Sequence, residues 1–508
     1  MRHATLLSLV ATSALLTIPA RADDLGGGKA GSHGRIPRFV LESWIPGQPS
    51  AFRFVDLPRG AIGAVAILSD RAGSLRIPGL GTLVVDIARP GAAFIPIQTS
   101  LVIPKLPLAL QGVSLVYQGL YLDARKLLLT NGTRADVFTP TVMVGNQRQS
   151  ANSLSVIDAS TRRVVQRLTN SENGYVTYSA DRKFAFVCEP GSQRNRIVAY
   201  DLRRKPIRVA GTVSVSGGIR YGCAVTRDGK RLYAPLHNGI SVIDSDPASA
   251  KFLTELRKIP TKITGNPGTI FTGPLDLAVT PDGRKLYIAY GERLAFPAKS
   301  HVGVIDLTQS STPEKLIPIT TGGTFRITPT LEFATHQRIK MGPMGRYVYL
   351  GEWGVDPAVL GSRFVRGFTN GALVTVILVP LDRQFRTIAT GGFQASELAV
   401  DRLGRNVWVA QIGRGQVGQA LRIDIDAQSN KRWSIAATVQ VDPTPYRTGA
   451  GPLGIDVTPD GATVFVSVAE DRGHPTPQVV TIDARTNKLF GRPIRVESLP
   501  ATLRVQQR

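Results

Sequence analysis

The chain has 508 residues, including 51 Gly and 34 Pro, and only 7% of its residues are aromatic. This composition favours many short strands and turns over helical bundles, and the length predicts more than one domain. The formal net charge of +24 indicates attraction to anionic polymers or, alternatively, a general arginine bias with solvated side chains. No Lys/Arg block with interleaved aromatic residues occurs, so we expect no specific nucleic-acid site.

Residues 1–22 have the pattern of a secretory signal peptide. Arg2 and His3 precede the apolar run ATLLSLVATSALLTIPA, and Ala20-Arg21-Ala22 forms an A-x-A cleavage site. The run is too short for a spanning helix, and no later apolar segment reaches about 18 residues, so we expect no transmembrane segment. The pattern predicts an exported protein, periplasmic or extracellular. Residues 23–34, DDLGGGKAGSHG, are expected to be a flexible mature N-terminus.

Residues 35–138 alternate strand-sized apolar segments, such as GAVAIL and GTLVVDI, with turn residues. Such runs, bounded by Gly, Pro and Asp, predict a small antiparallel β-sandwich. The segment IPKLPLALQGVSLVYQGLYLD within this region resembles an accessory β module found on large secreted bacterial proteins. That resemblance implies no particular chemistry.

One hairpin motif recurs after this region. It reads VTRDGKRLYAPL from Val225, VTPDGRKLYIAY from Val279 and VTPDGATVFVSV from Val457. Asp-Gly between alternating apolar runs is a strong hairpin signal, because Gly adopts a positive φ without steric cost. We place six such turns, at Asp181, Asp228, Asp282, Met344, Leu403 and Asp460.

A second marker is an apolar strand that ends in Asp. It occurs seven times, at Asp158, Asp201, Asp244, Asp306, Asp382, Asp424 and Asp483. Seven such strands and six hairpins predict that the seventh hairpin is divided between TPTVMVGN (139–146) and PATLRV (500–505). We therefore predict an all-β protein in which residues 139–508 form a seven-bladed β-propeller closed by strands from both its ends, which leaves no open sheet edge.

The alternation of VTPDGRKLYIAY-type hairpins with SVID strands resembles the YVTN-type repeat propellers. Their superfamily also includes seven-bladed lactonase-like proteins. The resemblance implies a secreted or surface propeller that binds a partner, with hydrolysis of lactones as an alternative activity.

Polar residues directly after the second strands are expected to meet on one face of the disc, where loops on a rigid scaffold bind ligands. We call this predicted set the mouth face. It comprises Glu189, His237, Glu292, Arg293, Glu352, Trp353, Gln411, Arg414, Asp471, Arg472 and His474.

Three charged residues occupy one equivalent position near the start of an inner strand, namely Asp276, Arg338 and Glu397. They are the candidate catalytic residues: a carboxylate could act as general base on a lactone while the guanidinium stabilises the oxyanion. Alternatively, the carboxylates could bind Ca²⁺. The histidines lack zinc-ligand spacing and no C-x-x-C-H occurs, so we expect no other metal or cofactor.

The chain has two cysteines, Cys188 and Cys223. The first ends the second strand of one predicted blade and the second begins the inner strand of the next, so both should lie near the same face. An exported protein meets an oxidising compartment, and we therefore predict a disulfide between them.

These observations favour a secreted, non-catalytic binding or scaffold protein that presents the mouth face to a protein or polysaccharide partner. One alternative is a lactonase-type hydrolase with its site at the mouth of the propeller channel. Another is an envelope protein that binds polyanions through its excess positive charge.

Overall fold

The computed structural model describes the backbone of most strands and their turns. The described residues are 19–26, 38–41, 50–55, 62–69, 72–77, 81–85, 93–96, 100–103, 114–123, 126–130, 132–136, 139–146, 153–169, 174–179, 181–189, 195–264, 273–294, 300–309, 314–319, 325–328, 331–352, 373–392, 394–412, 417–442, 452–469, 476–497 and 500–506. Within these ranges there is no α-helix, and the one 3₁₀ turn is η2 (Val379–Leu381). The fold is all-β, as the sequence predicted.

The chain divides into two compact units, with the boundary between Pro140 and Thr141. In the first unit, one sheet has the order β1-β11-β9-β4-β7 with β10 beside β9, a second has the order β2-β3-β8, and β5 pairs with β6. Every described strand pair is antiparallel. The strands are β1 (Pro19–Gly26), β2 (Arg38–Leu41), β3 (Ser50–Val55), β4 (Ile62–Ser69), β5 (Ala72–Ile77), β6 (Gly81–Val85), β7 (Ala93–Pro96), β8 (Ser100–Ile103), β9 (Ser114–Asp123), β10 (Lys126–Leu129) and β11 (Gly132–Asp136).

The packing of these sheets into a sandwich and cleavage after Ala22 both remain predictions. Strand β1 spans that cleavage site, and it also includes residues 23–26 of the segment expected to be flexible. Its pairing with β11 gives this backbone the hydrogen bonds of a sheet.

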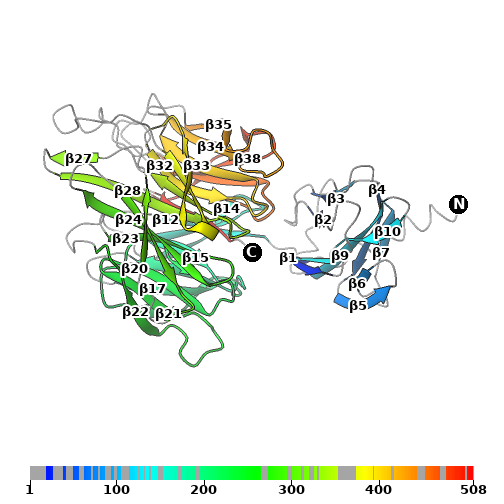
Figure 1. Cartoon of the computed structure of the whole chain (residues 1–508), viewed down its shortest axis with the longest axis horizontal. Coiled ribbons are helices and arrows are strands. Elements are labelled where there is room, and N and C mark those ends of the chain that lie inside the picture. Colours follow the sequence, from blue (N-terminus) through cyan, green and yellow to red (C-terminus); the bar gives the residue numbers. More distant parts are fainter. Residues whose placement is uncertain are drawn as a thin grey trace. The chain divides into compact units, whose positions relative to one another are not determined.

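The second unit is a β-propeller, and the described residues form seven blades (Figure 1). Blades 1 to 3, written from the inner strand outward, are β41 (Pro500–Val505), β12 (Thr141–Asn146), β13 (Ser153–Asp158), β14 (Arg163–Thr169); β15 (Tyr175–Tyr178), β16 (Phe184–Glu189), β17 (Arg196–Asp201), β18 (Arg208–Ser214); and β19 (Ala224–Val225), β20 (Arg231–Leu236), β21 (Gly239–Asp244), β22 (Glu255–Pro260).

Blades 4 to 7 continue the ring in chain order. They are β23 (Gly273–Val279), β24 (Lys285–Leu294), β25 (Ser300–Asp306), β26 (Lys315–Ile319); β28 (Leu331–Met341), β29 (Tyr347–Glu352), β30 (Leu373–Leu378), β31 (Arg383–Ala389); β32 (Gln394–Val400), β33 (Asn406–Ile412), β34 (Gly418–Asp424), β35 (Ser434–Asp442); and β36 (Pro452–Val457), β37 (Thr463–Val468), β38 (Gln478–Asp483), with β39 (Lys488–Leu489) and β40 (Ile494–Arg495) both beside β38.

Blade 1 is built from both ends of the propeller sequence. Its inner strand β41 pairs antiparallel with β12, so that Val142 lies opposite Val505 and Val144 opposite Leu503. These are the two segments that the hairpin count assigned to one blade. The pairing closes the ring, because no edge remains between the first and the last blade.

Blades 4 and 5 share a feature that the repeat pattern did not predict. The end of β24 continues past its blade and pairs with the beginning of β28, from Gly291 opposite Thr335 to Leu294 opposite Glu332. The short strand β27 (Phe325–Thr328) extends this ladder on the other side of β28. In Figure 1, β27 and the first half of β28 extend away from the other strands of blade 5.

The hydrogen bonds of the turn between the first two strands of a blade explain why the sequence TPDG recurs. In blade 4, the Thr280 hydroxyl donates to Asp282 Oδ1 (2.5 Å) and accepts the Lys285 N–H (2.9 Å), while Asp282 Oδ1 also accepts the Arg284 N–H (3.0 Å). Gly283 lies at φ +72°, a conformation that glycine adopts without strain. The Thr–Asp pair therefore fixes the hairpin, and the same bonds recur at Asp228 and Asp460.

The core consists of apolar clusters between neighbouring blades. Trp408 of β33 is 1% exposed and belongs to a cluster that joins blades 6 and 7, together with Ile455 and Val466. Corresponding clusters join blades 1 and 2, 2 and 3, 3 and 4, 4 and 5, and 5 and 6. The sheets of blades 2 to 6 are thus covered on both faces, which explains the near-continuous apolar residues of their middle strands.

Candidate functional site

The inner strands present two rings of side chains, because residues two apart on a strand point the same way. We call the equivalent residues near the start of each inner strand the first ring, and those two positions later the second ring. The first ring is Tyr175, Gly222, Asp276, Arg338, Glu397, Gly454 and Thr502. The second is Thr177, Ala224, Ala278, Lys340, Ala399, Asp456 and Arg504.

The structure brings the three candidate catalytic residues together. Asp276, Arg338 and Glu397 are 2%, 4% and 1% exposed. Arg338 Nε lies 2.9 Å from Glu397 Oε2. The three residues belong to blades 4, 5 and 6, and their equal spacing from the hairpin turns was the sequence signal that grouped them.

Glu397 is the centre of a charge network that joins both rings. Besides Arg338, it faces Lys340 Nζ at 3.2 Å and Arg504 Nη2 at 3.2 Å. Lys340 Nζ also lies 3.8 Å from Asp276 Oδ2. One buried carboxylate thus balances cations from blades 5 and 1.

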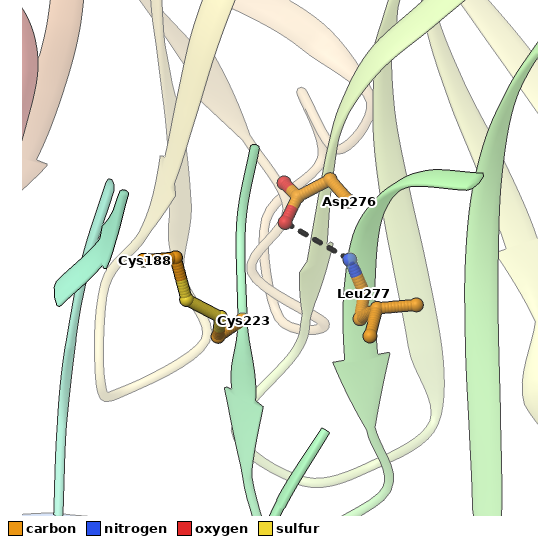
Figure 2. Close-up of a disulfide and its surroundings, with 4 residues drawn as sticks. All are labelled: Cys188, Cys223, Asp276 and Leu277. Carbon is orange, nitrogen blue, oxygen red and sulfur yellow. Dashed lines mark hydrogen bonds between the residues drawn. A yellow bond between two sulfur atoms is a disulfide. The ribbon is translucent and has the colours of Figure 1, made fainter. Parts of the chain in front are cut away.

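Asp276 is held mainly by backbone groups. Its Oδ1 accepts the N–H of Leu277 (2.9 Å, Figure 2), and its Oδ2 accepts the N–H of Ile339 on the next blade (3.1 Å). Gly222 makes room for this carboxylate, because a Cβ at residue 222 would lie only 1.8 Å from Oδ1. Asp276 therefore connects blade 4 to blade 5, and the glycine on blade 3 allows it to do so.

Arg338 lies between two tyrosine rings. Its Cζ is 4.6 Å from the ring centroid of Tyr175 and 5.1 Å from that of Tyr221. The two rings meet edge to face, with centroids 4.9 Å apart. A desolvated guanidinium against an aromatic ring gains about 2 kcal/mol, so the tyrosines help to keep this cation buried.

The environment of Glu397 determines its protonation. Burial raises the pKa of Glu397, but Arg504, Lys340 and Arg338 outweigh it and lower the pKa to about 2. Burial lowers the pKa of Arg338, and Glu397, Tyr175 and Asp276 more than restore it. Both groups are therefore fully charged at neutral pH, and Glu397 is a poor proton acceptor.

A further carboxylate lies in the second ring, where the sequence analysis did not look. Asp456 is 7% exposed, and its oxygens accept the N–H groups of Val457 (2.9 Å) and of Val505 (2.9 Å). Burial raises the pKa of Asp456 above its ordinary value, and Arg504 and these backbone bonds offset that effect only in part. Lys340, Asp456 and Arg504 could have been found from the sequence, because each lies two residues after a first-ring position and such residues share one side of a strand.

The described side chains of the mouth face form hydrogen bonds with other residues of the protein. Glu189 is fully buried and accepts a bond from Arg196 Nε (2.5 Å), and Gln411 is 1% exposed and donates to Gln419 (3.1 Å). His237 is partly exposed, and its Nδ1 accepts the Gly218 N–H (3.0 Å). The side chains of Glu292, Arg293, Glu352, Trp353, Arg414, Asp471, Arg472 and His474 lie outside the described part of the chain.

His237 is surrounded by positive charge. Burial lowers its pKa, and Arg220 and Lys258 lower it further. The bond from Gly218 requires an unprotonated Nδ1. His237 is thus a neutral imidazole at neutral pH.

Cys188 and Cys223 form a disulfide (Figure 2). It joins the second strand of blade 2 to the segment that enters blade 3. Cys188 lies opposite Tyr175 in the ladder, and Cys223 follows Gly222. The bridge therefore supports both tyrosines that hold Arg338 and the glycine beside Asp276.

Among the described residues, no group of three or more His, Cys, Asp or Glu side chains could hold a metal ion. In the channel network, the carboxylates face cations or backbone N–H groups, which occupy the oxygen positions that Ca²⁺ would need. No helix in the described part of the chain is long and apolar enough to cross a membrane.

Comparison with known proteins identifies the architecture. The periplasmic gluconolactonase of Pseudomonas aeruginosa superposes with a TM-score of 0.50 at 17% identity, over 72% of this chain and 98% of that one. A Bacteroides uniformis protein provisionally assigned as a 6-phosphogluconolactonase gives 0.50 at 14% identity, over 72% and 99%. The chain has the fold of the lactonase-like propellers. At these identities the likeness shows the fold alone.

The chain matches no protein-family model and no curated protein sequence.

Proposed function

We propose that this protein is a non-catalytic binding propeller and that the charge network in its channel holds the blades together. The observation that supports this most directly is the environment of Glu397, which lies within 3.2 Å of the charged groups of Arg338, Lys340 and Arg504. A carboxylate with three cationic partners is stabilised in its ionised form, whereas a general base needs a pKa near the working pH.

The network connects five blades in sequence around the ring. Asp276 comes from blade 4, Arg338 and Lys340 from blade 5, Glu397 from blade 6, Asp456 from blade 7 and Arg504 from blade 1. Three carboxylates and three cations balance one another. Such a network resists separation of the blades, because removing Glu397 leaves the buried cations of blades 5 and 1 without that partner.

Lactone hydrolysis is the second candidate function. Two propellers of the same fold carry lactonase names, and three cations beside buried carboxylates could stabilise an oxyanion. The two proposals differ in what happens when a sugar lactone is supplied. A binding propeller leaves the rate of ring opening unchanged, whereas a hydrolase accelerates it with saturation.

The deciding experiment is a pH-stat assay of the purified chain with gluconolactone and 6-phosphogluconolactone. We expect the rate of acid release to equal that of buffer alone. Saturable acceleration that is lost in Asp276→Asn, with the folded fraction of the variant checked by circular dichroism, would overturn the proposal in favour of a hydrolase.

We further propose that the protein acts outside the cytoplasm. The signal-peptide pattern of residues 1–22 and the disulfide support this, because disulfides persist in oxidising compartments. Cell fractionation with an antibody to the chain tests it, and a cytoplasmic pool that keeps the full N-terminus would contradict it.

A further inference from the structure

Two neighbouring blades depart from the acidic turn of the repeat. In blades 2, 3, 4 and 7 the turn residue is Asp, and its carboxylate accepts a bond from the Ser or Thr two residues before it. In blades 5 and 6 the same position holds Met344 and Leu403, which are 73% and 39% exposed. Neither residue can make that bond, and each places an apolar side chain in solvent instead, although in blade 6 Asp401 stabilises the turn by accepting the Arg405 N–H (2.9 Å).

Exposed apolar side chains gather around these two turns. The described residues include nine large hydrophobic side chains that are exposed, and five of them belong to blades 5 and 6. We call these five the turn patch. They are Met344 (73%), Leu381 (52%), Phe385 (41%), Leu403 (39%) and Ile435 (38%). Such a concentration on a folded protein is typical of an interaction site.

The turn patch crosses the boundary between the two blades. The ring centroids of Phe385 on blade 5 and Trp433 on blade 6 are 5.7 Å apart, and the Tyr347 ring packs against both, with centroid distances of 5.7 Å and 5.2 Å. The two inner turns also touch, because the Met344 methyl group lies 3.9 Å from the position of a Cβ at Gly404. These contacts place the turns of Met344 and Leu403 side by side and Phe385 beside blade 6, so exposed apolar side chains of both blades meet at this boundary.

The charge around the turn patch is positive. The segments 344–347, 381–386, 401–405 and 424–435 that carry it contain seven basic and four acidic residues, a net charge of +3. The basic residues are Arg346, Arg383, Arg386, Arg402, Arg405, Lys431 and Arg432.

The acidic residues of these segments are engaged within the protein. Asp424 accepts the Ser429 hydroxyl (2.5 Å), and Asp426 lies 3.6 Å from Arg405 Nε. Asp382 binds Lys285 Nζ (2.7 Å) and the Tyr287 hydroxyl (2.5 Å). Asp401 is 5% exposed and accepts bonds from Asn406 Nδ2 (2.7 Å) and the Arg405 N–H (2.9 Å). The field that a partner meets at this surface is therefore dominated by the arginines and the lysine.

We propose that the turn patch binds an acidic peptide segment of a partner protein, anchored by aliphatic or aromatic side chains. The proposal rests on the binding function proposed above and assigns it to the face that carries the hairpin turns. A second copy of this chain fits less well, because the same patch would bring identical positive charges together. A polysaccharide also fits less well, because four of the five exposed side chains, Met344, Leu381, Leu403 and Ile435, are aliphatic and offer a sugar neither a ring to stack on nor a hydrogen bond, and Phe385 is the one aromatic member.

Selection from a random peptide display library against the full chain tests this proposal. We expect the enriched peptides to be rich in Asp and Glu and to carry Leu, Phe or Trp. In fluorescence anisotropy, Leu381→Ser and Met344→Ser should each weaken their binding about tenfold, the usual loss of an interface anchor. Val209→Ser is the matched control, since Val209 is 57% exposed on blade 2, and it should leave the affinity unchanged.

A second series of variants tests the charge. Arg386→Gln should weaken binding at low salt and reduce its dependence on salt, because Arg386 is exposed beside Phe385. Enrichment of neutral or basic peptides, no enrichment at all, or equal loss in Val209→Ser would overturn the proposal. So would polyuronate binding that displaces the peptides and is itself lost in Leu381→Ser, which would identify a polysaccharide site.

The outcome is distinguishable from that of the proposed function. The same preparations can be assayed for lactone opening, which none of the turn-patch substitutions should affect. Turnover of lactones would contradict the non-catalytic function and leave the peptide results to stand. Absence of turnover together with unaffected peptide binding in Leu381→Ser would overturn the assignment of this surface alone.

Discussion

Glu397 is the residue on which the channel network depends. It is 1% exposed, and Arg338, Lys340 and Arg504 all face it within 3.2 Å. Its carboxylate offsets the desolvation of these cations, so the stability of the channel depends on one negative charge supplied by blade 6. Surface ion pairs contribute far less, because water screens them.

Glu397→Gln keeps the size of the side chain and removes its charge. We expect the variant to lose about 3–5 kcal/mol of unfolding free energy, because three cations then lie buried without that partner. Urea unfolding measures the change. Arg167→Gln is the matched control, since Arg167 is 58% exposed and lies 3.7 Å from Glu497, and it should cost at most about 1 kcal/mol. Equal losses in the two variants would contradict this account of the network.

The pKa of Glu397 also predicts a pH dependence. Its pKa is about 2 in the folded protein and about 4.3 in an unfolded chain, so the unfolded state binds the proton more readily. The stabilisation is complete above about pH 4.3 and is lost as the pH falls towards about 2. The difference in unfolding free energy between the parent chain and Glu397→Gln should therefore shrink from pH 6 to pH 3. A constant difference would contradict the prediction.

The sequence predicted that three charged residues of the first ring occupy equivalent positions, but not how their side chains pair. Repeat spacing placed Asp276, Arg338 and Glu397 at equivalent positions, and in the structure Arg338 pairs with Glu397 while Lys340 lies between Glu397 and Asp276. Their pairing could not be predicted, because it depends on which side chain reaches across to the next blade. Lys340 and Arg504 were missed since only one position of each inner strand was considered, although they decide the charge state of Glu397.

At the level of strands, the turn chemistry made most of the fold predictable. Asp282 and Gly283 form the turn that their sequence indicates, and the strand β41 occupies the inner position assigned to it. The ladder between β24 and β28 was not predicted, because these residues lie in an insertion that the repeat does not contain. Insertions follow no periodicity, so their pairing is set by the neighbouring blades.

The disulfide between Cys188 and Cys223 is a testable connection between two such elements. It closes a loop of 35 residues, for which chain entropy predicts a stabilisation of about 3–4 kcal/mol. We expect the double variant Cys188→Ala/Cys223→Ala to lose about this much unfolding free energy. Reduction of the parent chain should lower its stability similarly and leave the variant unchanged. Insensitivity of the parent chain to reductant, with thiol release confirmed, would contradict the prediction.

For the whole propeller, closure of blade 1 couples the two ends of its sequence. Removing residues 500–508 takes away β41, exposes the edge of β12 and deletes Arg504 from the network. We expect the truncated chain to be recovered mainly as aggregate, because an uncovered strand edge pairs with other chains. Size-exclusion chromatography after expression measures this. Removing only residues 507 and 508 is the control, and a monomeric, thermally stable truncation at residue 499 would contradict the expectation.

The closure by β41 also determines when the propeller can form. A ribosome makes β12 first and β41 after all the other blade strands, so blade 1 of an emerging chain lacks its inner strand until the end of synthesis. During that interval the inner edge of β12 is unpaired and the charge network lacks Arg504. A circular permutant that begins at β41 and continues directly into β12 would build blade 1 first, and its ring would then close by the docking of blade 7 and not by the pairing of a single final strand.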